Sequence, residues 1–417
     1  MRDSSLTAKR LSRWLRRSGT LPHGRVTNVS VEIELETTIS KLVFLTASYS
    51  AEAPADLPRN LVVKSPLKSG EVSEAQFYKQ LAPSLGTPPL VRCLATVEDE
   101  GDGSTIVLED LRATHDHPPW PLPPSRTQCE GAMDALACLH AQWWEAPTLG
   151  QAIGQLHTPE SLTSMVQGIA AHLPKFIDTI GDALTAEACN VFERVFSSSL
   201  KPWMRLTDQR ALTIIHGDAY TWNFLFPRSG EGAAFLIDWQ LWHVDVGARD
   251  LAFLMALHWY PSRRRELERQ LIRYYHEGLL RQGVSDYAVD ELWLDYRRCA
   301  VRNSTFPNFL ESWYETRRLV ASTRVRVGSL SRPELRRTAV VRFPLRDAAT
   351  KHLLLNTVRI ETWRSCRSKG AMAKTSILAR QSLSSSWCER FQDRTGADSC
   401  ASSTGRYGSY SAPGDRR

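Results

Sequence analysis

Apolar and polar residues alternate through residues 26–49, where Val29, Val31 and Ile33 are separated by polar side chains. A period of two is typical of half-buried strands, so this stretch predicts an antiparallel hairpin that turns within residues 36–40. Continuous apolar runs predict further buried strands at residues 61–64, 106–111, 212–215 and 233–237. The pattern therefore predicts a β-rich part at residues 26–110.

Further along the chain, apolar residues recur every three to four positions, which is typical of helices that bury one face. In residues 131–144 the face consists of Met133, Leu136 and Leu139, and His140 is interpreted as a packing histidine. The same periodicity returns at residues 162–196, 263–275 and 289–301. A proline-rich segment at residues 118–124 is typical of a linker. The chain is therefore predicted to be α+β, with a mainly helical part at residues 111–320.

Residues 1–25 predict a basic amphipathic helix, because Leu11, Trp14 and Leu15 stand among arginines. Two interpretations are open. An arginine-rich, acid-poor segment is typical of a transit peptide. The serines before Leu6 and the glycine at Gly19 instead suit the caps of a folded element, and we favour a first helix packed on the β-rich part.

The net charge of +7 belongs to the end of the chain. Residues 321–417 hold 19 of the 52 Lys and Arg residues and 7 of the 45 Asp and Glu residues, so this extension carries +12 and the remainder −5. Its Ser- and Arg-rich composition predicts partial disorder. We favour a solvated tail. A nucleic-acid or acidic-membrane contact, or an altered reading frame over an ordinary helix, would give the same composition.

The eight cysteines are scattered without a C-x-x-C pair, which argues against a zinc site or a disulfide scaffold and suits a reducing cytoplasm. No apolar run approaches the ~20 residues of a membrane helix. The mildly acidic body argues against a nucleic-acid partner. Nothing in the pattern requires an obligate protein partner.

The candidate chemistry lies in residues 212–254. His216, Gly217, Asp218 and Asn223 form the pattern H-G-D-x-x-x-x-N, and Asp238 follows the next apolar run. Protein kinases have the same interval between the Asp and the Asn of H-R-D-x-x-x-x-N, followed by the metal-binding Asp of Asp-Phe-Gly. A phosphoryl group leaving ATP needs magnesium for its charge and a base for the acceptor. The spacing predicts Asp218 as the base and Asn223 and Asp238 as ligands of Mg²⁺.

A lysine ends the apolar run at residues 61–64. A buried charge is costly when it is unpaired, so Lys64 needs an anionic partner, and Glu74 or Glu71 could supply it. In kinases a strand lysine holds the α and β phosphates and pairs with a helix Glu. We predict that Lys64 binds ATP and is positioned by Glu74. The alternative is a lysine that extends from the strand edge into solvent.

Taken together, H-G-D-x-x-x-x-N, Ile-Asp-Trp-Gln at residues 237–240 and Arg-Asp-Leu-Ala at residues 249–252 resemble the aminoglycoside phosphotransferase and choline kinase superfamily. Glu-x-x-Phe-Tyr at residues 74–78 and the run at residues 136–144 resemble its ecdysteroid-kinase-like branch. The resemblance covers roughly three quarters of the chain. It implies a two-lobed protein-kinase-like fold, a small antiparallel β-rich N-lobe and a mainly helical C-lobe, with ATP between the lobes.

The same resemblance implies further site residues. Backbone groups near Glu109 and Leu111 would bind adenine, and Ser40 would contact a phosphate, although no glycine-rich loop is present. His216 and Gly217 would shape the loop around the base. Asp250 would cap the start of a helix and brace that loop.

The predicted reaction is transfer of the γ-phosphoryl group of ATP, with Mg²⁺, to a hydroxyl of a small molecule. An aminoglycoside, a sterol, a choline-like amine or a sugar would each fit. Trp222, Trp239 and Trp242 flank the motif as packing residues or as an aromatic wall for a cationic acceptor. Two other hypotheses are a pseudokinase that binds nucleotide without transfer and a nucleic-acid binder acting through the tail.

Overall fold

The computed structural model describes residues 6–37, 40–67, 74–85, 89–98, 104–118, 123–180, 186–197, 210–303 and 326–327. All of these residues belong to one compact unit, Met1–Thr362. The predictions for Glu71 and for the tail beyond residue 327 lie outside the described residues.

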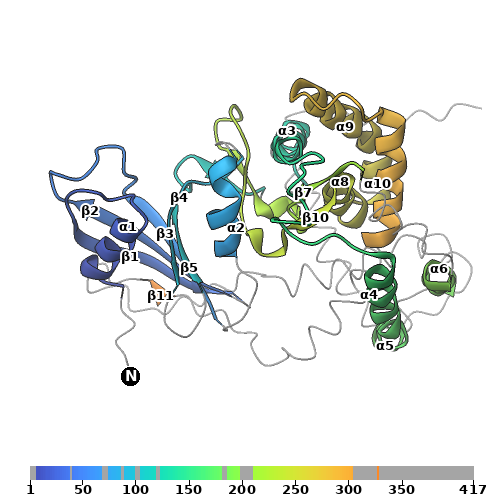
Figure 1. The fold of residues 1–417 in the computed structure, drawn as a ribbon, viewed down its shortest axis with the longest axis horizontal. Helices are drawn as coiled ribbons and strands as arrows, with labels where there is room; N and C mark the ends of the chain where they lie inside the picture. Colours follow the sequence, from blue (N-terminus) through green and yellow to red (C-terminus); the bar gives the residue numbers. More distant parts are fainter. Residues whose placement is uncertain are drawn as a thin grey trace, which may run out of the picture. The chain divides into compact units, whose positions relative to one another are not determined.

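An antiparallel sheet dominates the N-terminal part (Figure 1). Its strands are β1 (Val26–Glu36), β2 (Ser40–Tyr49), β3 (Asn60–Pro66), β4 (Cys93–Glu98), β5 (Ser104–Glu109) and the short edge strand β11 (Arg326–Val327). The strand order is β11-β1-β2-β3-β5-β4. The predicted hairpin is β1–β2, whose register places Glu36 opposite Lys41. In β3, Lys64 pairs with Leu42 on one side and Ile106 on the other, so its backbone is fixed within the sheet.

Two helices, α1 (Ala8–Arg17) and α2 (Glu74–Gln80), cover opposite faces of this sheet. Val107 packs in the cluster that contains α1, whereas its neighbours Ile106 and Leu108 pack in the cluster that contains α2. This opposition follows from the alternation of side chains along β5. Helix α1 spans Ala8–Arg17, and its N-cap is Thr7, whose side chain accepts a hydrogen bond from the N–H of Arg10.

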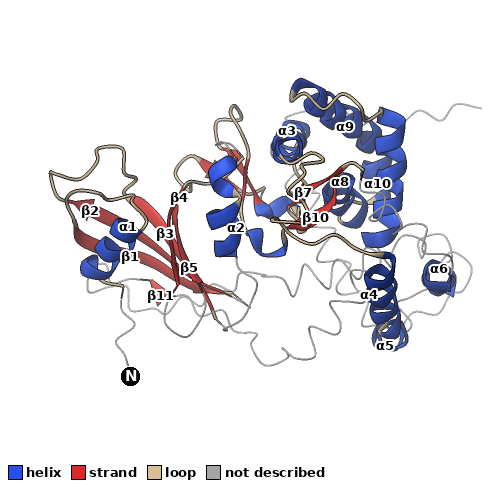
Figure 2. Cartoon of the chain, in the orientation of Figure 1, coloured by secondary structure: helices blue, strands red, loops and turns tan. Residues whose placement is uncertain are grey.

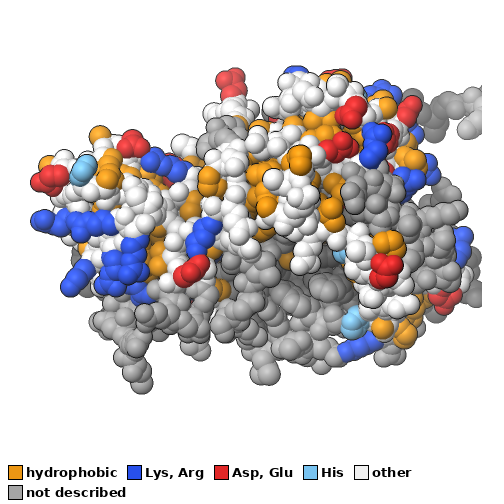
Figure 3. Space-filling view, in the orientation of Figure 1, with side chains coloured by type: hydrophobic (Ala, Val, Ile, Leu, Met, Phe, Trp, Pro, Cys, Tyr) orange, Lys and Arg blue, Asp and Glu red, His pale blue; other side chains and the backbone are white. Residues whose placement is uncertain are grey.

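The basic side of α1 faces solvent. Figure 3 shows Lys and Arg side chains gathered on the face of the molecule that carries this helix. Its exposed basic residues are Lys9, Arg13, Arg16 and Arg17. The apolar side is buried against the sheet through Leu11, Trp14 and Leu15. An element that buries one face in this way is part of the folded unit.

The rest of the described chain is mainly helical (Figure 2). The helices are α3 (Arg126–Gln142), α4 (Pro159–Ala171), α5 (Leu173–Ile180), α6 (Ala186–Ser197), α8 (Ala248–Ala252), α9 (Pro261–Arg281) and α10 (Val289–Asn303). A π-helical turn, Phe253–Leu257, extends α8, and short 3₁₀ turns lie at Ala82–Ser84, Thr221–Asn223 and Trp239–Leu241. Helix α3 packs on α9 and α10 on α8. Ser125 and Gln128 form a capping box that fixes the start of α3.

Two small sheets lie within the helical part. One pairs β7 (Leu212–Ile215) with β10 (His243–Val246), and the other has the order β6 (His115–Asp116), β8 (Phe224–Pro227), β9 (Phe235–Leu236). The two apolar runs that precede Asp218 and Asp238 are therefore strands of different sheets. An antiparallel sheet followed by a mainly helical part confirms the α+β prediction.

No helix in the described part of the chain combines the length and the apolar character needed to cross a membrane. The cysteines within this part, Cys93, Cys129, Cys138, Cys189 and Cys299, are free thiols.

Candidate active site

Asp218 and Asn223 are held together by a tight loop that follows β7. All four residues of β7 are buried, so the strand delivers residues 216–218 to a fixed place. The 3₁₀ turn Thr221–Asn223 then brings the chain back. Asn223 Nδ2 donates to the carbonyl of Asp218 at 2.7 Å and to its Oδ2 at 3.0 Å. The four residues between Asp218 and Asn223 are thus the loop length that brings the Asn223 amide back to the Asp218 carboxylate.

Asp238 reaches the same place from β9. The N–H of Ile237 donates to the carbonyl of Asn223 at 3.0 Å. His216 Nε2 donates to the carbonyl of Ile237 at 2.9 Å, as expected for a histidine that bonds to backbone. Asp238 itself has φ +68°, in the left-handed region that few residues other than glycine adopt. Such strain persists where the surroundings impose it, and it is concentrated at functional sites.

Lys64 lies between two carboxylates. Its Nζ is 2.8 Å from Asp238 Oδ1 and 2.5 Å from Glu74 Oε2. Burial of Lys64 opposes its protonation, but the charges of Asp238 and Glu74 outweigh that effect and raise its pKa. The side chain is therefore a fixed cation, and Glu74 is its partner on helix α2.

Helix α2 is fastened to the turn that contains Asp238. Glu74 Oε1 accepts a hydrogen bond from the N–H of Trp239 at 3.3 Å. The Trp239 ring is fully buried and stacks on Phe77, with ring centroids 3.9 Å apart and planes at 7°. Gln240 Nε2 donates to Ser40 Oγ at 3.2 Å, which places Ser40 beside the same turn. Trp239 is thus a packing residue, and the aromatic-wall interpretation does not apply to it.

The segment after β5 presents the backbone groups expected to meet adenine. The N–H of Glu109 donates to the carbonyl of Arg92, and the carbonyl of Leu111 accepts from Thr114 and His115. No described residue accepts a hydrogen bond from the N–H of Leu111. The N–H of Leu111 is therefore a candidate donor to adenine.

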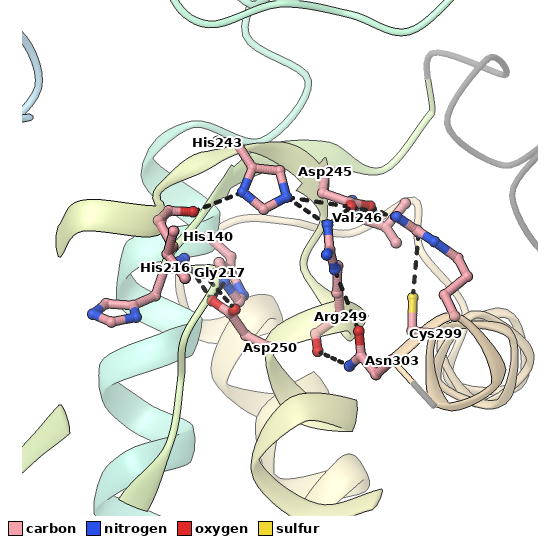
Figure 4. Close-up of polar contacts among 12 residues, drawn as sticks. His140, His216, Gly217, His243, Asp245, Val246, Arg249, Asp250, Cys299 and Asn303 are labelled. Carbon is pink, nitrogen blue, oxygen red and sulfur yellow. Dashed lines mark hydrogen bonds and ion pairs between the residues drawn. The ribbon is translucent and has the colours of Figure 1, made fainter. Parts of the chain in front are cut away.

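Asp250 braces the loop that carries Asp218 (Figure 4). Its Oδ2 accepts from the N–H of His216 at 2.7 Å and its Oδ1 from the N–H of Gly217 at 3.0 Å. His140 Nε2 donates to Oδ2 at 3.2 Å. Burial opposes ionisation of Asp250, but these contacts with His140 and His216 lower its pKa. The expectation that Asp250 caps a helix was wrong: α8 begins at Ala248, and the carboxylate bonds to the loop instead.

A second buried carboxylate, Asp245, was missed by the sequence analysis. Arg302 Nη2 and Nη1 donate to it at 2.6 and 3.0 Å, and Arg249 Nη1 donates at 2.8 Å. Burial raises the pKa of Asp245, but the charges of Arg302 and Arg249 outweigh it and hold the pKa well below its usual range. An acidic residue within the short apolar strand β10 was the available signal.

The donor set suits Mg²⁺. The described residues contain no group of three His, Cys, Asp or Glu side chains that could hold a metal. Magnesium is usually bound by one or two carboxylates together with substrate phosphates and water. The Asp238 carboxylate and the Asn223 amide oxygen, which lies opposite the Nδ2 that binds Asp218, meet this requirement.

A lysine–glutamate pair, an Asp–Asn loop and a second Asp on an α+β scaffold define a kinase-like phosphotransferase. The model of the ecdysteroid kinase-like family matches residues 72–283 of this chain. The chain therefore belongs to the ecdysteroid kinase-like family, which confirms the resemblance and indicates a small-molecule kinase. No curated protein sequence matches the chain.

Several solved structures are distantly similar. A choline/ethanolamine kinase family protein from Mesorhizobium loti is 16% identical, with 70% of this chain and 82% of that chain covered and a TM-score of 0.41. A macrolide 2′-phosphotransferase from Brachybacterium faecium is 15% identical, with 69% of this chain and 87% of that chain covered and a TM-score of 0.43. Spectinomycin phosphotransferase, solved with ADP and spectinomycin, is 13% identical, with 86% of this chain and 98% of that chain covered and a TM-score of 0.46. Likeness at this level carries no argument about the substrate of this chain.

Proposed function

We propose that this protein is an ATP- and Mg²⁺-dependent kinase that moves the γ-phosphoryl group to a hydroxyl of a small molecule. The observation that carries the proposal is the position of Lys64, paired with both Glu74 and Asp238, while Asn223 bonds to Asp218. These contacts bring together, from three separate stretches of sequence, the cation, the metal ligands and the base that phosphoryl transfer requires.

Lys64 binds the α and β phosphates in this proposal. Its raised pKa keeps it cationic, and Glu74 holds its ammonium group in place when Asp238 turns to the metal. Asn223 and Asp238 hold Mg²⁺, which would neutralise charge on the phosphate oxygens. The N–H of Leu111 and the backbone near Glu109 bind adenine. Ser40, the first residue of β2, accepts a hydrogen bond from Gln240 in the turn after Asp238, and in this proposal it contacts a phosphate.

Asp218 accepts the proton of the acceptor hydroxyl. Asp250 fixes the loop of Asp218 by accepting hydrogen bonds from the N–H groups of His216 and Gly217. The hydrogen bond from Asn223 Nδ2 fixes the plane of the carboxylate. A base held in this way needs no reorganisation when the acceptor arrives, which is the condition for efficient general base catalysis.

A panel of alcohols tests the proposal. The family takes its name from ecdysteroid kinases, so steroid alcohols belong in the panel with aminoglycosides, choline-like amines and sugars. ATP consumption is measured for each acceptor with Mg²⁺ and again with EDTA. We expect acceptor-dependent consumption that EDTA abolishes. ATP binding without consumption for any acceptor would instead favour the pseudokinase, and absence of both would overturn the nucleotide site.

A further inference from the structure

The loop of the proposed base and the loop of the proposed metal ligand touch at one carbonyl group. We call residues 216–218 the base loop and residues 238–242 the metal loop. Gly217 has φ +79°, and a Cβ built on it would lie 2.1 Å from Leu241 O and 3.1 Å from His243 Cε1. The two loops are therefore already in van der Waals contact. The position of the Leu241 carbonyl limits how closely the base loop approaches the metal loop.

His243 holds that carbonyl. Its Nδ1 donates to Leu241 O at 2.8 Å, and its Nε2 accepts from Arg249 Nη1 at 2.5 Å. The arginine can only donate, so it fixes the tautomer with the proton on Nδ1. The backbone of His243 is paired with Ile215 in the β7–β10 ladder, one residue before the base loop. A single residue thus pairs through its backbone with the residue that precedes the base loop and binds the metal loop through its ring.

Arg249 is itself held by buried groups of strand β10 and of the end of helix α10 (Figure 4). Its Nη1 donates to Asp245, which is only 1% exposed and is also bound by both Nη groups of Arg302. Asn303 bonds to Arg249 at both its side chain and its carbonyl, at 3.4 and 3.2 Å. A buried ion pair with several hydrogen bonds resists displacement, because removing one partner leaves an uncompensated charge. The arginine therefore has little freedom to move.

We propose that His243 and Arg249 are positioning residues, which transmit the fixed place of helix α10 to the Leu241 carbonyl and so set the approach of Asp218 to Asp238. The inference rests on the proposed function, because the spacing matters only if both loops act on one phosphoryl group. Nothing in the catalytic motif requires a histidine at this place. The role is separate from that of Asp250, whose carboxylate binds the base loop and His140.

The test compares three variants of the full-length protein. His243→Phe keeps a ring but removes both nitrogens. His243→Asn places an amide N–H near the position of Nδ1, so it can still donate to Leu241 O. His276→Phe is the matched control, since His276 Nε2 also donates to a carbonyl, that of Tyr287, at 2.6 Å, in a place remote from both loops. The probe reaction is Mg²⁺-dependent ATP hydrolysis with water as acceptor.

We expect His243→Phe to lower kcat by about 10- to 100-fold with little change in KM for ATP, because the groups are misplaced rather than removed. His243→Asn should recover most of the loss. Amide hydrogen exchange at His216 and Gly217 should become about fivefold faster in His243→Phe, which corresponds to one lost hydrogen bond. His276→Phe should change neither measurement.

Equal effects of His243→Phe and His276→Phe would overturn the inference, because both would then reflect general stability. Unchanged exchange at the base loop in His243→Phe would also overturn it. If the parent neither binds nor hydrolyses ATP, the proposed function fails first. The exchange measurement still shows whether His243 holds the loops, so the two failures are distinguishable.

Discussion

Lys64 and Asp238 form an ion pair of 2.8 Å although 174 positions separate them in the sequence. Lys64 lies in strand β3 of the N-terminal sheet, and Asp238 follows β9 in the helical part. The pair joins the lysine expected to bind phosphate to the carboxylate expected to bind Mg²⁺. Glu74 supplies the second carboxylate of the arrangement, and in the proposed function it stays with Lys64 when Asp238 binds the metal.

Replacing Lys64 by Met should lower the free energy of unfolding of the nucleotide-free protein by about 3 to 5 kcal/mol, because Glu74 keeps a buried charge without its cation. The double variant Lys64→Met/Glu74→Gln should recover part of this loss. Urea denaturation of the parent and both variants measures it. A double variant less stable than Lys64→Met would contradict the pairing.

The contribution of Lys64 to the free energy of unfolding should not depend on pH near neutrality. Its pKa in the folded protein is raised above the ordinary 10.5, so the stability it contributes is fully present below that value. It is lost only as the pH rises through the higher folded pKa. The difference between parent and Lys64→Met should stay constant between about pH 6 and 9.

The helices and the site residues were open to prediction for different reasons. Helices α3, α9 and α10 each bury one face, and apolar spacing records this directly. Lys64 required an anion because it ends an apolar run of the sequence, so the pairing with Glu74 could be anticipated. The pairing of β7 with β10, rather than with the neighbouring apolar run, has no local signal. An acidic residue within an apolar strand marks Asp245, but nothing in the local sequence indicates its partners Arg249 and Arg302, which come from two helices.

Gly217→Ala should separate backbone strain from the contact between loops. The new Cβ would meet Leu241 O at 2.1 Å in a residue with φ +79°. Gly19→Ala is the matched control, with φ +78° and nothing within 4 Å. We expect the control to cost about 1 kcal/mol of unfolding free energy, and Gly217→Ala about 2 kcal/mol more, with loss of ATP turnover. Equal losses in the two variants would show that the loops are not in contact.

Asp250→Asn should destabilise the protein by about 1 to 3 kcal/mol at neutral pH, because its amide cannot accept from both loop N–H groups and His140. The pKa of Asp250 is lowered from 3.8, so its contribution is present above that value and is lost as the pH falls through the lower folded pKa. The difference between parent and variant should therefore shrink below about pH 4. Chemical denaturation as a function of pH measures it. A constant difference would argue against an ionised Asp250.

Asp238→Ala should remove the dependence of ATP binding on Mg²⁺, because it deletes a metal ligand while Lys64 keeps Glu74 as its partner. Calorimetric titration with ATP, with and without Mg²⁺, makes the comparison. Asp134→Ala is the control, since Asp134 is half exposed and pairs only with surface groups. Binding that remains enhanced by Mg²⁺ in Asp238→Ala would place the metal elsewhere.

In the proposed reaction, Asp218 takes the proton of an acceptor while ATP is bound with Mg²⁺. The most direct measurement is the rate of phosphoryl transfer from ATP by the parent and by Asp218→Asn, at saturating nucleotide and Mg²⁺. We expect kcat to fall by about 10²- to 10⁴-fold in Asp218→Asn, while the KM for ATP is unchanged. Equal rates in the two proteins would contradict it.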